Sequence, residues 1–118
     1  MILRPSMYRI SRYKMSELHG HLDLLVLAVL ADAPAHGYAV IEELRRRSAG
    51  AFDLPEGTVY PALHRLETSG FLTSRWEAHG RRRRVYRLTR RGRGRLERGR
   101  SEWSAFAGAV TAVVGEAR

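Results

Sequence analysis

The sequence predicts a mainly α-helical domain that carries one small β-hairpin, and three observations lead to this fold class. Apolar residues recur at helical spacing in three segments between residues 17 and 70. A period of two then appears in two short runs joined by a Gly-containing turn. Helical spacing returns in the last segment, and 118 residues suffice for one domain with a hydrophobic core.

The first two helices are expected at about residues 17–31 and 37–47. The first has a wide apolar face, because positions 18, 22, 25, 26, 29 and 30 are all apolar. Pro34 and Gly37 are turn and helix-start signals between the two helices. One side of the second helix carries Tyr38, Ile41 and Leu44.

The third helix is expected in the segment EGTVYPALHRLETSGFL, residues 56–72. Counting about 100° per residue from a core-facing Val59, the outward side carries Gly57, Pro61, His64 and Thr68, flanked by Tyr60 and Arg65. A proline is tolerated in the first turn of a helix, because its missing N–H has no partner there. We therefore expect the helix to begin near Thr58, whose hydroxyl lies at the positive end that favours phosphate.

Two strands are expected between residues 72 and 88. Leu72, Ser74 and Trp76 fall on one side of the first strand, and Arg84, Tyr86 and Leu88 fall on one side of the second. The tip of this hairpin is expected at residues 79–82. The four consecutive cations Arg81, Arg82, Arg83 and Arg84 form either a solvated charge run or, as we favour, a site for phosphate or the minor groove.

The fourth helix is expected from about Arg90 to Val114, with Thr89 as its N-cap. Its apolar residues form one stripe: Leu96, Trp103, Phe106, Val110 and Val113. Nothing else in the sequence is left to cover that stripe. A second copy of the chain is the simplest cover, so these residues are predicted to dimerise.

Charge and domain organisation favour a polyanionic partner. The net charge is +9, and all but one of the 21 basic residues are arginine, a bias that a GC-rich genome could also produce. We expect a basic tail at residues 1–14, a globular unit at 15–89 and a dimerisation helix at 90–118. The tail is read as disordered or as a misassigned start, with a DNA-binding arm as the alternative.

Several classes of protein are excluded. Without cysteine there is no disulfide and no thiolate metal site, and the longest apolar run, residues 24–31, is too short to span a membrane. No secretory signal is present, so a cytoplasmic location is expected. His19, His21 and Asp23 suggest a metal site, but residues two apart, such as His19 and His21, point to different sides of a helix, so we do not expect one. No catalytic constellation appears, so we expect neither an enzyme nor a cofactor.

Three helices followed by a hairpin is the order of a winged helix-turn-helix. Three segments in this order resemble PadR-family transcriptional regulators: HGYAVIEEL (36–44), GTVYPALHRLETSGFL (57–72) and RRRVYRLTRRG (82–92). The resemblance runs from about Leu18 to Gly92, and the single last helix is typical of the compact branch of the family. Pro55 is a departure, because the family commonly has a capping Ser there.

The resemblance implies a homodimeric repressor that binds palindromic double-stranded DNA and is released by an effector. In some compact relatives, tryptophans at the dimer centre hold flat aromatic ligands, which makes Trp103 the candidate for a small aromatic effector. Two alternatives stay open: a winged-helix module for protein association, and a protein that binds small aromatic molecules without binding DNA.

The residues predicted to contact DNA come from three elements. Tyr38 is expected to touch a phosphate, and Tyr60 either contacts DNA or packs on the hairpin. Arg65 either contacts DNA or pairs with Glu67 or with an acid of the second helix. The full set is Tyr38, Thr58, Tyr60, His64, Arg65, Arg81, Arg82, Arg83 and Arg84.

Overall fold

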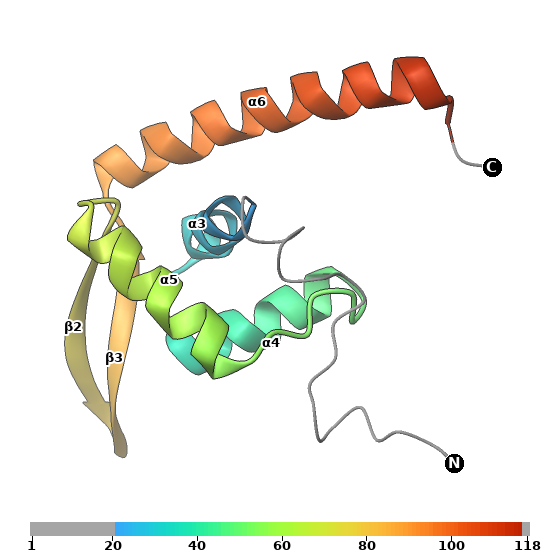
Figure 1. Cartoon of the computed structure of the whole chain (residues 1–118). Helices are drawn as coiled ribbons and strands as arrows, with labels where there is room; N and C mark the ends of the chain where they lie inside the picture. The colour runs from blue at the N-terminus through green and yellow to red at the C-terminus, as the bar shows by residue number, and fades with distance from the viewer. Residues whose placement is uncertain (1–20, 117–118) are drawn as a thin grey trace, which may run out of the picture.

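The computed structural model describes residues 21–116, so the expected tail at 1–14 and the start of the first expected helix lie outside the described residues. The elements are α3 (Leu22–Asp32), β1 (Ala35–His36), α4 (Gly37–Arg47), α5 (Glu56–Thr68), β2 (Leu72–His79), β3 (Arg81–Leu88) and α6 (Arg90–Val114) (Figure 1). Their order confirms the predicted fold class, a mainly α-helical unit with a small hairpin and one last helix.

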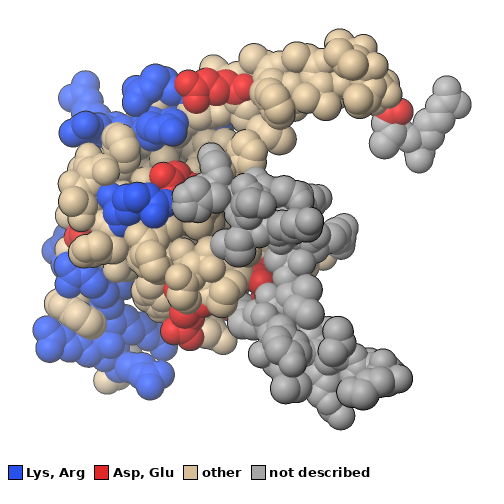
Figure 2. Space-filling model, viewed as in Figure 1, with Lys and Arg blue, Asp and Glu red and all other residues tan. Residues whose placement is uncertain are grey.

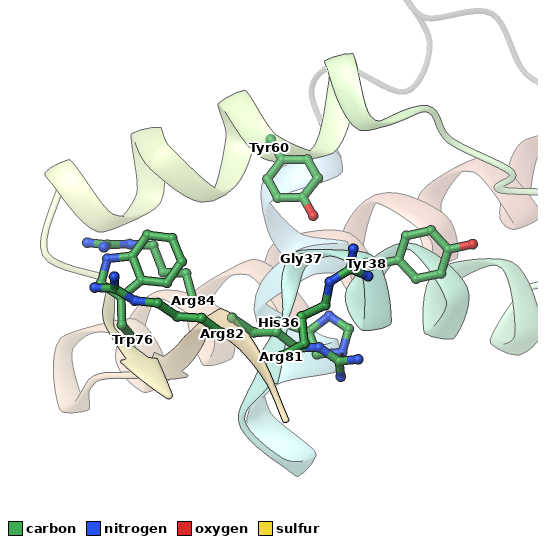
Figure 3. A pocket seen from close by; sticks show the side chains of 9 residues that line it. His36, Gly37, Tyr38, Tyr60, Trp76, Arg81, Arg82 and Arg84 are labelled. Carbon is green, nitrogen blue, oxygen red and sulfur yellow. Dashed lines mark hydrogen bonds between the residues drawn. The ribbon is translucent and has the colours of Figure 1, made fainter. Parts of the chain in front are cut away.

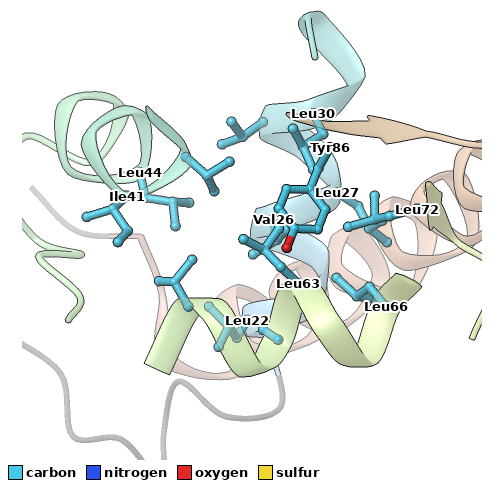
Figure 4. Packing of buried hydrophobic residues seen from close by; sticks show 14 of the residues in the cluster. Leu22, Val26, Leu27, Leu30, Ile41, Leu44, Leu63, Leu66, Leu72 and Tyr86 are labelled. Carbon is cyan, nitrogen blue, oxygen red and sulfur yellow. The ribbon is translucent and has the colours of Figure 1, made fainter. Parts of the chain in front are cut away.

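The core lies between α3, α4 and α5, and the hairpin closes one side of it (Figure 4). Leu27, Ile41 and Leu63 bring one almost wholly buried side chain from each helix, and Tyr86 adds the inward face of β3. Tyr38 is the exception to the predicted apolar side of α4, because 52% of it remains exposed.

The sheet contains a short strand that the sequence did not predict. In the order β1-β3-β2, the two residues of β1 pair with Tyr86 and Val85 of β3. The hairpin is also tighter than expected: His79 pairs with Arg81 across the turn, and only Gly80, with φ +77°, lies between the strands. The expected tip at 79–82 is therefore wrong, because pairing continues to the turn and places Arg82 within β3.

The expected start of α5 near Thr58 is also wrong. The helix begins at Glu56 after Pro55, and the N–H groups of Thr58 and Val59 both donate to the carbonyl of Pro55, at 3.0 and 3.2 Å. Pro61 consequently lies inside the helix, where it cannot donate to the carbonyl of Gly57. As its chemistry requires, Pro55 provides no side-chain cap.

The first half of α6 packs against the rest of the domain, and its second half extends beyond it (Figure 1). Gly92, Leu96 and Gly99 are buried, and Gly99 lies against Leu24 of α3. Leu96, at 2% exposure, is covered by its own subunit, so its place in the predicted dimerisation stripe is wrong. Beyond Gly99 the same face of α6 leaves the body, and its apolar residues are exposed. Neither α6 nor any other described helix has the apolar length that crossing a bilayer needs.

Gly92 is where α6 approaches the chain most closely. A Cβ atom there would collide with the backbone carbonyl of Phe71 and with a methyl group of Leu88, whereas a Cβ on Gly94 would meet only the end of the Arg98 side chain, 3.7 Å away. We expect Gly92→Ala to lower the free energy of unfolding by about 1–3 kcal/mol. Gly94→Ala is the matched control and is expected to raise it by roughly 0.5–1 kcal/mol. Urea titrations followed by circular dichroism measure both, and a harmless Gly92→Ala would contradict the packing.

Candidate nucleic-acid interface

A crevice of about 510 Å³ lies between the hairpin and the starts of α4 and α5 (Figure 3). Its lining consists of His36, Gly37, Tyr38, Tyr60, Trp76, Arg81, Arg82, Arg83 and Arg84. The structure thus brings together six of the nine residues predicted to contact DNA. The other three, Thr58, His64 and Arg65, lie on α5 outside the crevice.

Tyr60 joins α5 to the start of α4. Its ring lies against Gly37, where a Cβ atom would collide with it, and the hydroxyl points toward Gly37 (Figure 3). Burial raises the pKa of the Tyr60 phenol, and the carboxylate of Glu56 adds to this effect. The hydroxyl is therefore protonated at neutral pH, and with 38% of the residue exposed it remains available as a hydrogen-bond donor.

Trp76 organises two of the hairpin arginines. The guanidinium groups of Arg82 and Arg84 lie over its ring, 4.7 and 5.5 Å from the centroid (Figure 3). Such contacts are worth about 0.5–1 kcal/mol at exposed sites, and Trp76 is 52% exposed. Sequence reasoning did not assign Trp76 to the site, although its cross-strand pairing with Arg84 was a usable signal.

A carboxylate of α5 fixes the hairpin. Ser74 of β2 donates to Glu67 at 2.6 Å, and a guanidinium nitrogen of Arg84 lies 3.7 Å from the same carboxylate. Glu67 therefore lies on the hairpin side of α5, away from the outward face. This bonding holds the hairpin at one angle to α5, so the two elements present their polar groups together.

Arg65 pairs with neither of the acids that the sequence suggested. Its guanidinium donates to Asp23 in the first turn of α3, at 2.5 Å, because Glu67 points toward the hairpin instead. The Arg65 side chain is 49% exposed, so solvent screening limits this pair to about 1 kcal/mol or less. Phosphate can therefore compete with Asp23 for Arg65.

His36 caps α4 and touches the hairpin. Its Nδ1 accepts a hydrogen bond from the N–H of Ala39 at 3.3 Å, while its Nε2 lies 3.0 Å from a guanidinium nitrogen of Arg83. A neutral imidazole accepts at only one ring nitrogen, so with Nδ1 accepting the cap bond the hydrogen lies on Nε2, and protonation of Nδ1 removes the bond from Ala39. Burial lowers the pKa of His36, and the positive charge of Arg83 lowers it further.

A pH dependence of stability follows from His36. Because its pKa is lower in the folded chain, the unfolded chain binds the proton first as the pH falls through the ordinary value of 6.5. The contribution of the neutral ring is thus present above pH 6.5 and is lost progressively as the pH falls toward the folded-state pKa. We expect His36→Asn, which keeps a capping side chain, to remove this part of the slope in urea titrations between pH 5 and 8. Identical slopes for both proteins would contradict it.

The outward side of α5 carries no carboxylate at its centre. His64 is exposed and Thr58 is half-buried. Arginine side chains gather at the hairpin and at the start of α6, whereas the far half of α6 has none (Figure 2). Within residues 21–116, no three His, Asp or Glu side chains are placed to hold a metal ion, and His19 of the rejected metal site lies outside that range.

Three packed helices with a hairpin beside the third define a winged helix-turn-helix protein. The family model described as the transcriptional regulator PadR-like family matches residues 26–98, and the chain belongs to this family. Regulators of this family bind DNA and are not enzymes.

Individual relatives agree with this assignment. The transcriptional regulator Rv3488 of Mycobacterium tuberculosis is 43% identical over 74 residues, which cover 62% of this chain and 66% of the relative. A transcriptional regulator from Clostridium thermocellum has a similar structure, with a TM-score of 0.78, 25% identity, and coverage of 84% of this chain and 98% of that one. A PadR family transcription regulator from Clostridium difficile R20291 is also similar, with a TM-score of 0.73 and 30% identity, and the match covers 80% of this chain and 99% of that one. Near-complete coverage of these structures matches the compact architecture with one helix after the hairpin.

Proposed function

We propose that the chain is a homodimeric repressor that binds a palindromic operator. In this proposal α5 enters the major groove and contacts it through Thr58, Tyr60, His64 and Arg65. Tyr38 and the hairpin arginines contact the phosphate backbone of the DNA. The observation that carries it is an outward α5 face without a central carboxylate, placed beside the hairpin arginines. Trp76 and Glu67 hold two of these, Arg82 and Arg84, in position. Occupation of a promoter by such a dimer excludes other proteins, which is the simplest way to repress.

The overhanging half of α6 supports the dimer. Trp103, Phe106, Val110 and Val113 keep 46%, 59%, 41% and 85% of their surface exposed. An apolar row of this length on one helix face is typical of a helix that pairs with a second copy. The two copies of α5 must then lie about 34–36 Å apart to meet successive major grooves.

An aromatic effector at the dimer centre completes the proposal. The Trp103 ring lies 5.2 Å from His21 in an edge-on arrangement and 6.0 Å from Phe106. Planar aromatic molecules can stack on such exposed rings, and a change in how two α6 helices pair alters the spacing of the two α5 helices. In a Trp76→Phe variant Trp103 is the single tryptophan, so quenching by flat aromatic compounds that also release DNA supports this role. Quenching without release favours the alternative, a ligand-binding protein.

Selection of bound sequences from random duplex DNA tests the main proposal. We expect a consensus with two-fold symmetry whose half-sites are centred about 10–10.5 base pairs, or a multiple of this, apart. Enrichment of an asymmetric single site would contradict the dimer. No enrichment at all would contradict DNA recognition and favour a module for protein association.

A further inference from the structure

The first half of α6 is rich in arginine beyond what the proposed interface uses. Residues 90–100 contain six arginines and a single acid, Glu97. Glu97 pairs with Arg100 at 2.9 Å. The side chains at the start of α6 form a second basic area in Figure 2, separate from the hairpin arginines at the lower left.

Three of these arginines form a row, called here the α6 strip: Arg91, Arg95 and Arg98. Their i, i+4, i+7 spacing places them along one side of the helix. Arg91 and Arg98 are exposed and Arg95 is half-buried. No acidic side chain in the described part of the chain forms a salt bridge with any of the three. Arg93 and Arg100 lie about half a turn away, on the opposite flank.

The α6 strip is attached to the end of the proposed recognition helix. The Thr89 hydroxyl donates to the carbonyl of Gly70 at 2.7 Å, and its N–H donates to the carbonyl of Phe71 at 3.1 Å. The guanidinium of Arg91 lies 5.2 Å from the centroid of the Phe71 ring. Gly70 and Phe71 directly follow the last turn of α5, so the strip lies beside the C-terminal end of that helix.

The strip and the hairpin arginines occupy opposite ends of β3. Leu88 lies seven residues after Arg81, which is a span of about 24 Å at 3.4 Å per residue. A major groove is about 12 Å wide. Arginines at the two ends of a strand of this length can therefore reach the phosphates on both borders of the groove that α5 occupies in the proposed function.

We propose that the α6 strip binds the phosphate backbone of duplex DNA at the border of the major groove opposite to the hairpin. This inference rests on the proposed function, since it assumes α5 in the groove. The positive charge of the strip and its position beside α5 favour duplex DNA as its partner. Contacts to phosphate carry no sequence information, so the strip adds affinity equally to operator and unrelated duplexes.

Two double variants with the same change in charge on the same helix provide the test. Arg91→Gln/Arg98→Gln neutralises the strip, and Arg93→Gln/Arg100→Gln neutralises the opposite flank. For binding to the operator duplex found by sequence selection, we expect Arg91→Gln/Arg98→Gln to reduce the slope of log K against log salt by about 1.8. Each lost phosphate contact contributes about 0.9 to this slope. The second pair is expected to change the slope by less than half as much, and circular dichroism checks that both variants keep their helices.

Three outcomes decide the inference. An equal loss in both variants, or no loss in the first, overturns the strip while leaving the proposed function intact. A loss confined to the operator, with unrelated duplexes unaffected, also overturns it, because it indicates base contacts. Failure of the unmodified chain to bind any duplex overturns the proposed function and, with it, the inference about the α6 strip.

Discussion

Replacing Trp103 and Phe106 by aspartate is expected to make the chain monomeric and to weaken operator binding by roughly a hundredfold or more, the gain that linking two binding units typically provides. Both side chains lie on the overhanging half of α6, with 46% and 59% of their surface exposed. Burial of each large apolar side chain in a dimer contributes about 1.5–3 kcal/mol, whereas burial of an unpaired carboxylate opposes association.

The control for this prediction lies on the same helix. Ser101 and Ala105 are exposed and lie on the far side of α6 from the apolar row, so Ser101→Asp/Ala105→Asp adds the same charge without entering the interface. Sedimentation equilibrium gives the mass of each variant, and titration of a fluorescent operator duplex gives its affinity. A Trp103→Asp/Phe106→Asp protein that stays dimeric would show that another surface holds the copies together.

Periodicity predicted most of the fold because each element buries one face. Ile41, Leu63 and Tyr86 are where the alternation of apolar and polar residues placed them, and α6 begins and ends at the expected residues with Thr89 as its cap. β1 could not be predicted, because two residues carry no period and the strand exists only by pairing with β3.

The errors have two physical origins, which are local backbone bonds at the start of α5 and packing between elements at α6. Pro61 was expected in a first turn, but the helix gains that turn from bonds to the carbonyl of Pro55. Leu96 was assigned to the dimer because a helical stripe does not show where the body of the molecule ends. α3 covers the first half of that stripe and leaves the second half free.

The candidate site was predicted better in its residue types than in its contacts. Both tyrosines and the four hairpin arginines converge on one crevice. Their partners come from distant parts of the chain, as with Asp23 for Arg65 and His36 for Arg83. Such pairs depend on how α3, α5 and the hairpin pack, which a single sequence does not encode as spacing. Trp76 was overlooked because a period of two does not show which residues of one strand face stay exposed: Leu72 is buried on the same face, whereas 52% of Trp76 is exposed.

Replacing Arg82 and Arg84 by alanine is expected to weaken binding to any duplex at 0.15 M salt by roughly tenfold or more and to reduce the salt slope by about 1.8. Both guanidinium groups lie over Trp76, and Arg84 is also near Glu67, so they are held ready at little entropic cost. Fluorescence anisotropy with duplexes between 50 and 300 mM salt measures both quantities.

The contrast that interprets this result is a pair of arginines far from the crevice. Arg45 and Arg46 lie in the last turn of α4 beside Glu42 and Glu43, so Arg45→Ala/Arg46→Ala removes the same charge without touching the hairpin. If net charge alone governs binding, the two double variants lose the same amount. A selective loss in Arg82→Ala/Arg84→Ala assigns the phosphate contacts to the hairpin. Unchanged affinity and slope in that variant would mean that the hairpin does not grip DNA, and the module for protein association would become the better interpretation.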